Sequence, residues 1–214
     1  MSHAAVIADI VGSRRLPDRA TAQAALDAAI ARVEADFPLA DRPLRPIVGD
    51  ELQGVYPTLV GATTATLLLR LALPDGIECR FGIGVGPVRD VPSTAVGTIS
   101  EGPAWWAARA AIDIVHAKQS RALPSSRTWA VAAEGEDAAT AQSVRLANAA
   151  LLTRDQLISA MGERARRITY RRCLGHTQRA IAADEDISQS AVSQALVSSG
   201  GAVLVDAVQT LLSP

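Results

Sequence analysis

The chain has 214 residues, of which 49% are hydrophobic and 20% are charged, and its formal net charge is −1. This length and composition predict a globular protein with one large or two small domains, and they exclude a disordered or fibrous chain. The balanced charge gives no overall attraction to nucleic acid, so any contact with DNA has to come from a local patch. Cys79 and Cys173 are too few and too far apart for a zinc knuckle, and no basic stretch precedes a long apolar one near the N-terminus. We therefore expect a cytoplasmic protein that makes no contact with a membrane.

The first half of the chain predicts the element order β-α-β-β-α-β. Apolar runs, helix-forming stretches and turn residues place a strand at 4–10, a helix at 20–37, a hairpin at 46–56, a helix at 58–72 and a strand at 78–85. Asp18 and Thr58 are suited to cap the two helices, and Gly49-Asp50 supplies the turn of the hairpin. This order is typical of an α+β, ferredoxin-like fold, in which two helices cover one face of a four-stranded antiparallel sheet.

The predicted topology brings acidic residues together. Asp9 lies at the end of the first strand, and Asp50 lies at the tip of the hairpin with Glu51 beside it. The first strand and the hairpin are neighbours in this fold, so Asp9 and Asp50 can approach each other. Two carboxylates at strand ends are the minimum needed to hold a divalent cation against phosphate oxygens.

The middle of the chain continues with further elements. We expect a loop at 91–102, a helix at 103–118, a strand at 127–133 and a helix at 138–160. Gly82, Gly84 and Gly86 lie inside a strand and lack the spacing of a dinucleotide-binding fingerprint, so we expect them to allow close packing or a bulge. Of Trp105 and Trp106, we expect at least one to pack in the core.

The C-terminal part has the spacing of a helix-turn-helix over residues 178–196. The small Ala182 lies where the two helices would cross, and Ser188 would cap the second helix. Its polar side would present amide and hydroxyl groups that can bind base edges in a major groove, namely Gln189, Ser190, Ser193 and Gln194. Glu185 and Asp186 stand where such a turn usually has an apolar residue and a glycine, so we expect a distorted turn and some repulsion of DNA.

Arginines crowd into the residues just before this motif and at its start. We expect them to contact DNA phosphates, and the candidates are Arg167, Arg171 and Arg179. A division of the chain follows from these patterns: a palm domain at 1–135, a helical connector at 136–162 and a DNA-binding domain at 163–214.

Three segments together resemble a known family pattern. Ala8-Asp9-Ile10-Val11-Gly12, Gly49-Asp50-Glu51 and the run from Arg80 to Pro87 resemble the catalytic palm of class III nucleotide cyclases. The Ile-Val-Gly-Ser-Arg variant, together with Gly-Asp-Glu-Leu-Gln-Gly, more closely resembles the SatD family of small bacterial proteins, which carry a C-terminal helix-turn-helix. The resemblance covers residues 4–118 for the palm and about the last fifty residues for the DNA-binding unit.

The resemblance implies roles for single residues. It makes Asp9 and Asp50 ligands of Mg²⁺ or Mn²⁺, with Glu51 as a third candidate, and it places Gly12 and Ser13 where backbone amides hold phosphate. Arg14 has no assured counterpart, but a guanidinium there could bind a phosphate. Arg109 stands in the place of a transition-state arginine, whereas Trp105 stands in the place of an asparagine that an indole cannot replace. The resemblance therefore does not imply cyclisation by the usual mechanism.

Three functions are compatible with these patterns. The leading one is a homodimeric regulator that binds double-stranded DNA and whose palm binds a nucleotide with a divalent metal, so that the helix at 138–160 moves the DNA-binding unit. The second is an enzyme, a nucleotide cyclase or oligonucleotide synthase that makes a signal from nucleoside triphosphates. In the third, the palm serves only as a dimerisation scaffold for a DNA-binding protein.

Overall fold

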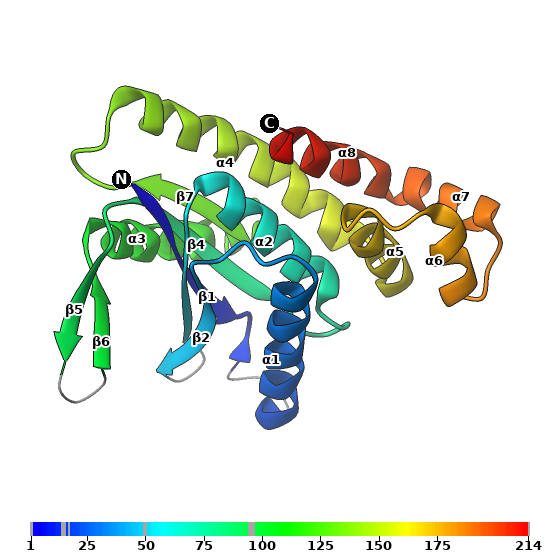
Figure 1. Ribbon diagram of the computed structural model, residues 1–214, viewed down its shortest axis with the longest axis horizontal. Helices are drawn as coiled ribbons and strands as arrows, with labels where there is room; N and C mark the ends of the chain where they lie inside the picture. The colour runs from blue at the N-terminus through cyan, green and yellow to red at the C-terminus, as the bar shows by residue number, and fades with distance from the viewer. Residues whose placement is uncertain (1, 14–15, 17, 49–50, 94–96, 214) are drawn as a thin grey trace.

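The computed structural model describes residues 2–13, 16, 18–48, 51–93 and 97–213. Its strands are β1 (His3–Ile10), β2 (Arg42–Val48), β3 (Glu51–Tyr56), β4 (Cys79–Gly86), β5 (Arg89–Ser93), β6 (Gly97–Glu101) and β7 (Thr128–Ala132). Its helices are α1 (Arg19–Asp36), α2 (Leu59–Ala72), α3 (Pro103–Gln119), α4 (Ala138–Ala160), α5 (Glu163–Cys173), α6 (Gln178–Asp184), α7 (Gln189–Ser199) and α8 (Gly201–Leu212). Figure 1 shows these elements with the same labels.

The main sheet has the predicted ferredoxin-like order. Its five strands follow the order β2-β3-β1-β4-β7, and the first four are antiparallel, as expected. The strand expected at 127–133 is β7, which extends the sheet by pairing parallel to β4. Asp18 and Thr58 accept hydrogen bonds from the backbone N–H groups of Thr21 and Gly61, so both predicted helix caps are confirmed.

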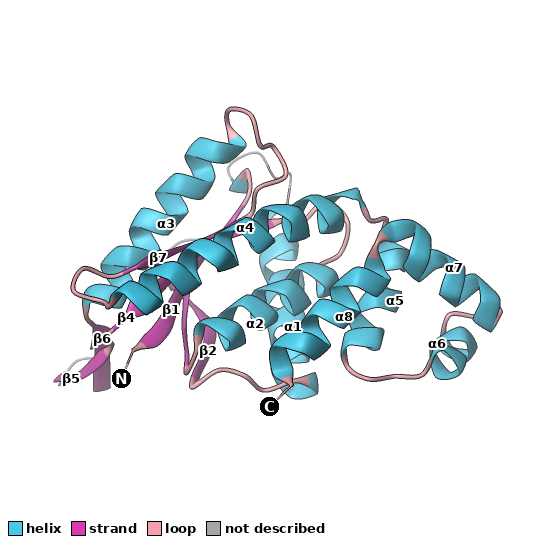
Figure 2. Cartoon of the chain, turned by 90° about the horizontal axis from the view of Figure 1, so that it is seen from above, coloured by secondary structure: helices cyan, strands magenta, loops and turns pink. Residues whose placement is uncertain are grey.

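Two helices cover one face of the sheet and a third covers the other. Apolar residues of alternate positions in β1, such as Val6 and Ala8, pack with Leu26 of α1 and Leu68 of α2 in the main core. The intervening residues Ala5 and Ile7 pack against α3 on the opposite face. Figure 2 shows α3 on one side of the strands and α1 and α2 on the other.

Helix α3 lies unusually close to β4, because β4 has glycines on that face. A Cβ atom on Gly82 would lie 2.3 Å from the carbonyl oxygen of Ala108, and one on Gly84 would lie 1.9 Å from that of Ala104. Any side chain would therefore push the helix off the sheet. The prediction that these glycines serve close packing is confirmed.

Both edges of the sheet are closed to further strands. At the β7 edge, the side chain of Asn148 in α4 accepts from the N–H of Ala130 and donates to its carbonyl oxygen, both at 2.8 Å. At the other edge, β2 contains Pro43 and Pro46, which lack an N–H group, and its register with β3 is irregular.

The expected loop at 91–102 is wrong: most of it belongs to a two-stranded ribbon made of β5 and β6. Val91 and Ile99 are exposed in this ribbon, at 38% and 48% of their surface. Because these residues are not buried, the sequence of the ribbon lacks the alternation of apolar and polar residues that predicts a strand. In Figures 1 and 2 the ribbon lies at the opposite end of the molecule from α6 and α7.

The C-terminal helices pack onto the α2 side of the palm. Tyr170 of α5, with Leu204 and Val208 of α8, belongs to the same buried core as α2. Residues 163–213 contain helices only, so the predicted helical unit is present, while its boundary as a separate domain stays a prediction. None of the helices in the described ranges is by itself long and apolar enough to cross a membrane; α7 and α8 pass that test only together, and they meet at an angle of 81°.

Candidate functional site

The predicted metal ligand Asp9 lies on the α3 face of the sheet, at the end of β1. The antiparallel register places it opposite Arg80 of β4, whose Nε donates to Asp9 Oδ1 at 2.8 Å. The pair is largely shielded, since 25% of the Asp9 side chain and 14% of the Arg80 side chain are exposed. An ion pair therefore holds this carboxylate at the sheet end.

Glu51 lies next to Asp9 at the start of β3. The antiparallel register pairs Ala8 of β1 with Leu52 of β3. Asp9 follows Ala8 and Glu51 precedes Leu52, so Asp9 and Glu51 are also neighbours across the two strands. Arg109 of α3 donates from Nη2 to both carboxylate oxygens of Glu51, at 2.7 and 2.6 Å. Gln53 donates to the same carboxylate at 3.0 Å.

The structure thus brings Asp9, Glu51 and Arg109 to one end of the sheet, and we name them, together with Arg80, the palm cluster. Arg80 is the member that the sequence prediction missed. Alternation along the strand at 78–85 puts it on the face opposite Phe81, beside Asp9, and that signal could have found it.

Asp50 and Arg14, expected as a metal ligand and a phosphate contact, lie outside the described residues. Among the residues that the structure describes, no group of three or more His, Cys, Asp or Glu side chains could hold a metal ion. The carboxylates of Asp9 and Glu51 are hard oxygen donors of the kind that Mg²⁺ and Mn²⁺ take, and each is bound to an arginine. A cation at the palm cluster would have to take them from these arginines, and metal binding stays a prediction.

The loop expected to hold phosphate follows directly. Gly12 has a φ of +69°, a left-handed conformation that glycine adopts without strain, and it turns the chain after β1. Val11 donates its N–H to the carbonyl oxygen of Glu78 at 2.8 Å, which anchors the turn to β4. Gly12 and Ser13 therefore stand between the palm cluster and α1, and their contact with phosphate stays a prediction.

The indole of Trp105 is engaged within the fold. Its Nε1 donates to the hydroxyl of Ser100 at 3.0 Å, and the ring packs against the small cluster beneath α3. Trp106 is 75% exposed. The expectation that at least one of the two tryptophans packs in the core is confirmed.

A second candidate site is formed by α6 and α7. The hydroxyls of Thr177 and Ser188 accept from the first turns of the two helices, as Ser188 was predicted to do. Helices α6 and α7 share a buried cluster with α5, made of Ile168, Ile181, Ala182, Val192 and Leu196. We name this pair of helices with its turn the helix pair.

The acidic turn of the helix pair has a structural explanation. Asp186 takes a φ of +52°, the left-handed conformation usually left to glycine, and aspartate tolerates it better than most residues. Glu185 accepts from Arg167 Nη2 at 2.8 Å and from its Nε at 3.1 Å. These hydrogen bonds lower the pKa of Glu185 below its usual value.

The polar side of α7 has the predicted composition. Its side chains line a shallow hollow and are Gln189, Ser190, Ser193 and Gln194, followed by Val197 and Ser198. Helix α7 carries no charged residue, and Gln189 donates to Gln178 of α6 at 3.2 Å. An uncharged face of amides and hydroxyls is therefore presented on one side of the helix pair.

The arginines next to the helix pair are mostly engaged within the chain. Arg167 binds Glu163 and Glu185, and Arg171 binds Asp184. Two arginines predicted to contact DNA phosphates, Arg167 and Arg171, therefore tie α5 to neighbouring acids, whereas Arg179 is exposed on α6. Their contact with DNA stays a prediction.

Fold and sites together define an α+β protein with a ferredoxin-like sheet, an arginine–carboxylate cluster at its end and a C-terminal helical part. Residues 3–210 match the SatD family, and the chain belongs to that family. No curated protein matches it.

Solved structures with a similar fold are nucleotide cyclases. An adenylate cyclase from Trypanosoma brucei in its monomeric state matches with 15% identity and a TM-score of 0.43, over 50% of this chain and 67% of that one. A bacterial light-regulated adenylyl cyclase matches with 12% identity and a TM-score of 0.44, over 61% of this chain and 43% of that one. The catalytic core of a rhodopsin-guanylyl cyclase in complex with ATPαS matches with 16% identity and a TM-score of 0.41, over 52% of this chain and 71% of that one. Similarity at this level assigns no activity to the chain.

Proposed function

We propose that this SatD-family protein is a regulator that binds double-stranded DNA through the helix pair and a nucleotide with divalent metal through the palm cluster. The observation that carries the proposal is the helix pair, with its two capped helices, its shared core and the exposed face of α7. The nucleotide site is the regulatory half of the same proposal.

The face of α7 supports recognition of bases. Glutamine amides both donate and accept hydrogen bonds, as adenine requires in the major groove, and serine hydroxyls pair with several base edges. Since α7 has no charge, phosphate contacts have to come from its neighbours. Arg179 on α6 is the exposed cation nearest in sequence to this face.

The palm cluster supports binding of a metal with a polyphosphate. Arg80 and Arg109 neutralise Asp9 and Glu51. A metal nucleotide would bring positive charge for the carboxylates and negative charge for the arginines, so both kinds of group would exchange partners without loss of charge pairing. Asp9, Asp50 and Glu51 would hold the metal, with Gly12, Ser13 and Arg14 near the phosphates.

A contact between α1 and α5 offers a route from one site to the other. Helix α1 follows the Gly12 loop, and its last residue Asp36 accepts from the hydroxyl of Tyr170 on α5 at 2.8 Å. Arg32 of α1 lies over the Tyr170 ring, 4.5 Å from its centroid. A shift of α1 on nucleotide binding would therefore be felt by α5, on which the helix pair is packed.

The DNA-binding half is tested by selecting preferred sequences from a random duplex pool and measuring fluorescence anisotropy. Gln194→Ala should weaken binding to the preferred sequence by about 10- to 100-fold, because one base contact is lost, while non-specific binding is kept. Gln209→Ala, on the exposed side of α8, is the matched control and should bind like the wild type. Equal affinity of the wild type and Gln194→Ala for every duplex would refute the role of α7.

The nucleotide half is tested by calorimetric titration of ATP and GTP with Mn²⁺. Asp9→Asn should abolish metal-dependent binding, whereas Asp113→Asn, an exposed residue of α3, should keep it. If Asp9→Asn leaves both affinities unchanged, the palm is a scaffold and the regulatory half of the proposal is wrong.

The position of Arg109 supports a second candidate function, that of an enzyme that makes a signal from nucleoside triphosphates. Its guanidinium already lies against Glu51 in the palm cluster, where it could stabilise a transferring phosphate. The wild type and Arg109→Ala are incubated with nucleoside triphosphates and Mn²⁺. Release of pyrophosphate with cyclic or linked products by the wild type, and loss of both in Arg109→Ala, would establish the enzyme. Nucleotide binding without any product supports the regulator.

A homodimer is part of the proposal, since two helix pairs would then read two half-sites. Exposed apolar side chains on the palm support self-association, with Trp106 75%, Ile47 58% and Ile99 48% exposed. Sedimentation equilibrium tests it, and Trp106→Ser should weaken the dimer.

A further inference from the structure

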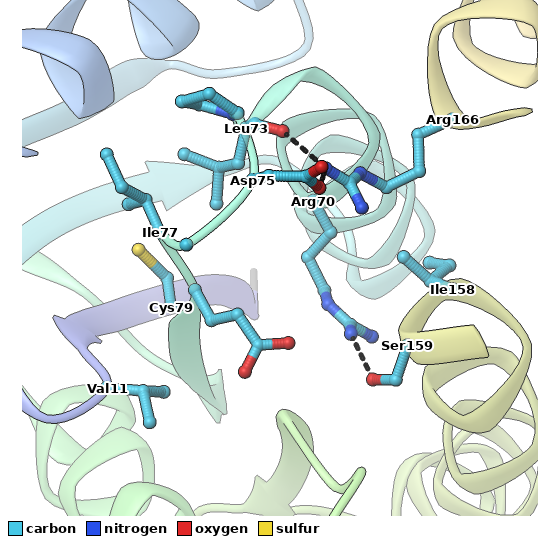
Figure 3. A pocket seen from close by; sticks show the side chains of 12 residues that line it. Val11, Arg70, Leu73, Asp75, Ile77, Cys79, Ile158, Ser159 and Arg166 are labelled. Carbon is cyan, nitrogen blue, oxygen red and sulfur yellow. Dashed lines mark hydrogen bonds and ion pairs between the residues drawn. The ribbon is translucent and has the colours of Figure 1, made fainter. Parts of the chain in front are cut away.

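A cavity of about 260 Å³ lies between the end of α2, the start of β4 and the junction of α4 with α5, and Val11, which precedes the Gly12 loop, contributes to its lining. Figure 3 shows the guanidinium of Arg70 inside it, beside the hydroxyl of Ser159, with Arg166 and Asp75 on a neighbouring wall. The walls come from the palm and from the C-terminal helices, so this cavity lies where the two parts meet.

The charges behind the cavity do not balance. Arg70, Arg127 and Arg154 are each at least nine-tenths buried, with 6%, 7% and 8% of their surface exposed. Among the described residues, two carboxylates bind them: the buried Asp155 pairs with both Arg70 and Arg154, and the half-exposed Glu78 pairs with Arg127. These three arginines and two carboxylates carry one positive charge in excess, which is costly at a largely buried position unless an anion compensates it.

Of these three arginines, Arg70 lines the cavity, whereas Arg127 and Arg154 lie behind it. All three also donate to backbone or hydroxyl oxygens, and Arg70 does so to the carbonyl oxygen of Asp155 at 3.5 Å and to Ser159. Burial lowers the pKa of Arg70 to about 10, and this agrees with a cation that lacks full compensation. The carboxylates that line the cavity do not help, since Asp75 binds Arg166 at 2.7 Å and Glu78 binds Arg127 at 2.5 Å.

Arg70 and Ser159 retain hydrogen-bond donors. Arg70 donates from Nη1 to Asp155 Oδ1 at 2.7 Å and from Nη2 to Ser159 Oγ at 2.9 Å. Its Nε has no acceptor among the described residues, and the Ser159 hydroxyl, which accepts from Arg70, keeps its own proton for a ligand. A guanidinium and a hydroxyl side by side are well suited to an oxyanion.

We propose that this cavity binds a small phosphate-bearing molecule, with Arg70 and Ser159 as its phosphate ligands. A phosphate group neutralises the excess charge and accepts from both donors, and the volume suits a compound smaller than most ligands of about 300–1,000 Å³ pockets. The ligand would fasten α2, α4 and α5 to one another, since Arg166 of α5 already donates to the carbonyl oxygen of Leu73 at the end of α2. It would thereby fix the C-terminal helices on the palm.

The experiment is thermal unfolding of the full chain in phosphate, in glycerol 3-phosphate and in acetate, each at constant ionic strength and without divalent metal. At a ligand concentration about ten times its Kd, phosphate or glycerol 3-phosphate should raise the Tm of the wild type by about 3 °C. Acetate should raise the Tm by a smaller amount. A larger response to inorganic phosphate means a free-phosphate site, and a larger response to the ester means a metabolite site; both support the proposal.

Ser159→Asp places a carboxylate beside Arg70 and mimics the anion. Since Ser159 is exposed near the end of α4, the variant should fold, with a Tm above that of the wild type in buffer alone and with no further response to phosphate. Ser143→Asp, an exposed residue of the same helix, is the matched control and should respond like the wild type.

Ser159→Ala gives a second, independent measurement. Calorimetric titration with phosphate should show about tenfold weaker binding than the wild type, because one hydrogen bond to a charged group is lost. Equal phosphate responses of the wild type, Ser159→Asp and Ser159→Ala, or a response to phosphate no greater than that to acetate, would overturn the proposal.

Discussion

Two arginine–carboxylate clusters in this molecule use the same chemistry for opposite purposes. At Asp155, a fully buried carboxylate accepts from two arginines and from the N–H groups of Arg127 and Thr128, at 2.7 and 2.6 Å. In the palm cluster, Glu51 pairs with an Arg109 whose side chain is half exposed. Burial makes the first cluster a fixed joint between α2, β7 and α4, whereas Arg109 of the second is accessible to water, as the proposed exchange of partners requires.

The largest effect is expected when the buried cluster is broken. Asp155→Asn would leave the charges of Arg70 and Arg154 without their shared partner, and we expect a loss of about 3–5 kcal/mol in the free energy of unfolding. Urea denaturation measures it. Asp206→Asn, an exposed residue of α8, is the control and should change stability little; a loss below about 1 kcal/mol for Asp155→Asn would mean that the cluster is not a joint.

An intermediate effect is expected at the helix pair, where Glu185→Gln removes a charge bound by Arg167. We expect a loss of about 1 kcal/mol at neutral pH. Because the pKa of Glu185 is lowered in the folded state, its contribution is present at pH values above the usual 4.5 and is lost as the pH falls through the lowered pKa. The difference between wild type and variant should therefore shrink in acid, as urea denaturation across pH would measure.

The smallest effect is expected at the palm cluster. Glu51→Gln should change the free energy of unfolding by less than about 1 kcal/mol, because its partner Arg109 is half exposed and can be solvated. Added salt should reduce the difference further, since exposed pairs are screened. A loss as large as that of Asp155→Asn would show that the palm cluster is structural and would count against ligand exchange there.

The order of the elements could be predicted because apolar periodicity records which face of each element is buried. The β-α-β-β-α-β pattern follows from that periodicity, and it places Asp9 beside the hairpin that carries Asp50 and Glu51. The predicted pair is Asp9 with Asp50, which lies outside the described residues, and the structure places Glu51 next to Asp9. The β5–β6 ribbon could not be predicted, since a ribbon without a buried face leaves no period.

The buried cluster left no signal either. Arg154 and Asp155 stand in a helix with many polar residues, where adjacent charges normally face water, and only the packing of α4 against β7 buries them. Likewise the ion pairs of Arg167 and Arg171 depend on how α5 meets α6, which no local pattern encodes. The sequence therefore indicates which groups can do chemistry better than it indicates which of them are already engaged.

The closed edges of the sheet limit how this protein can associate. With the amide of Asn148 covering the outer side of β7 and prolines interrupting β2, neither edge offers the run of free N–H and C=O groups that strand addition needs. Growth of the sheet from copy to copy, and the aggregation that accompanies it, is blocked at both ends. Strand addition to this sheet is therefore disfavoured, and the edges left for it among the described strands belong to the separate β5–β6 ribbon.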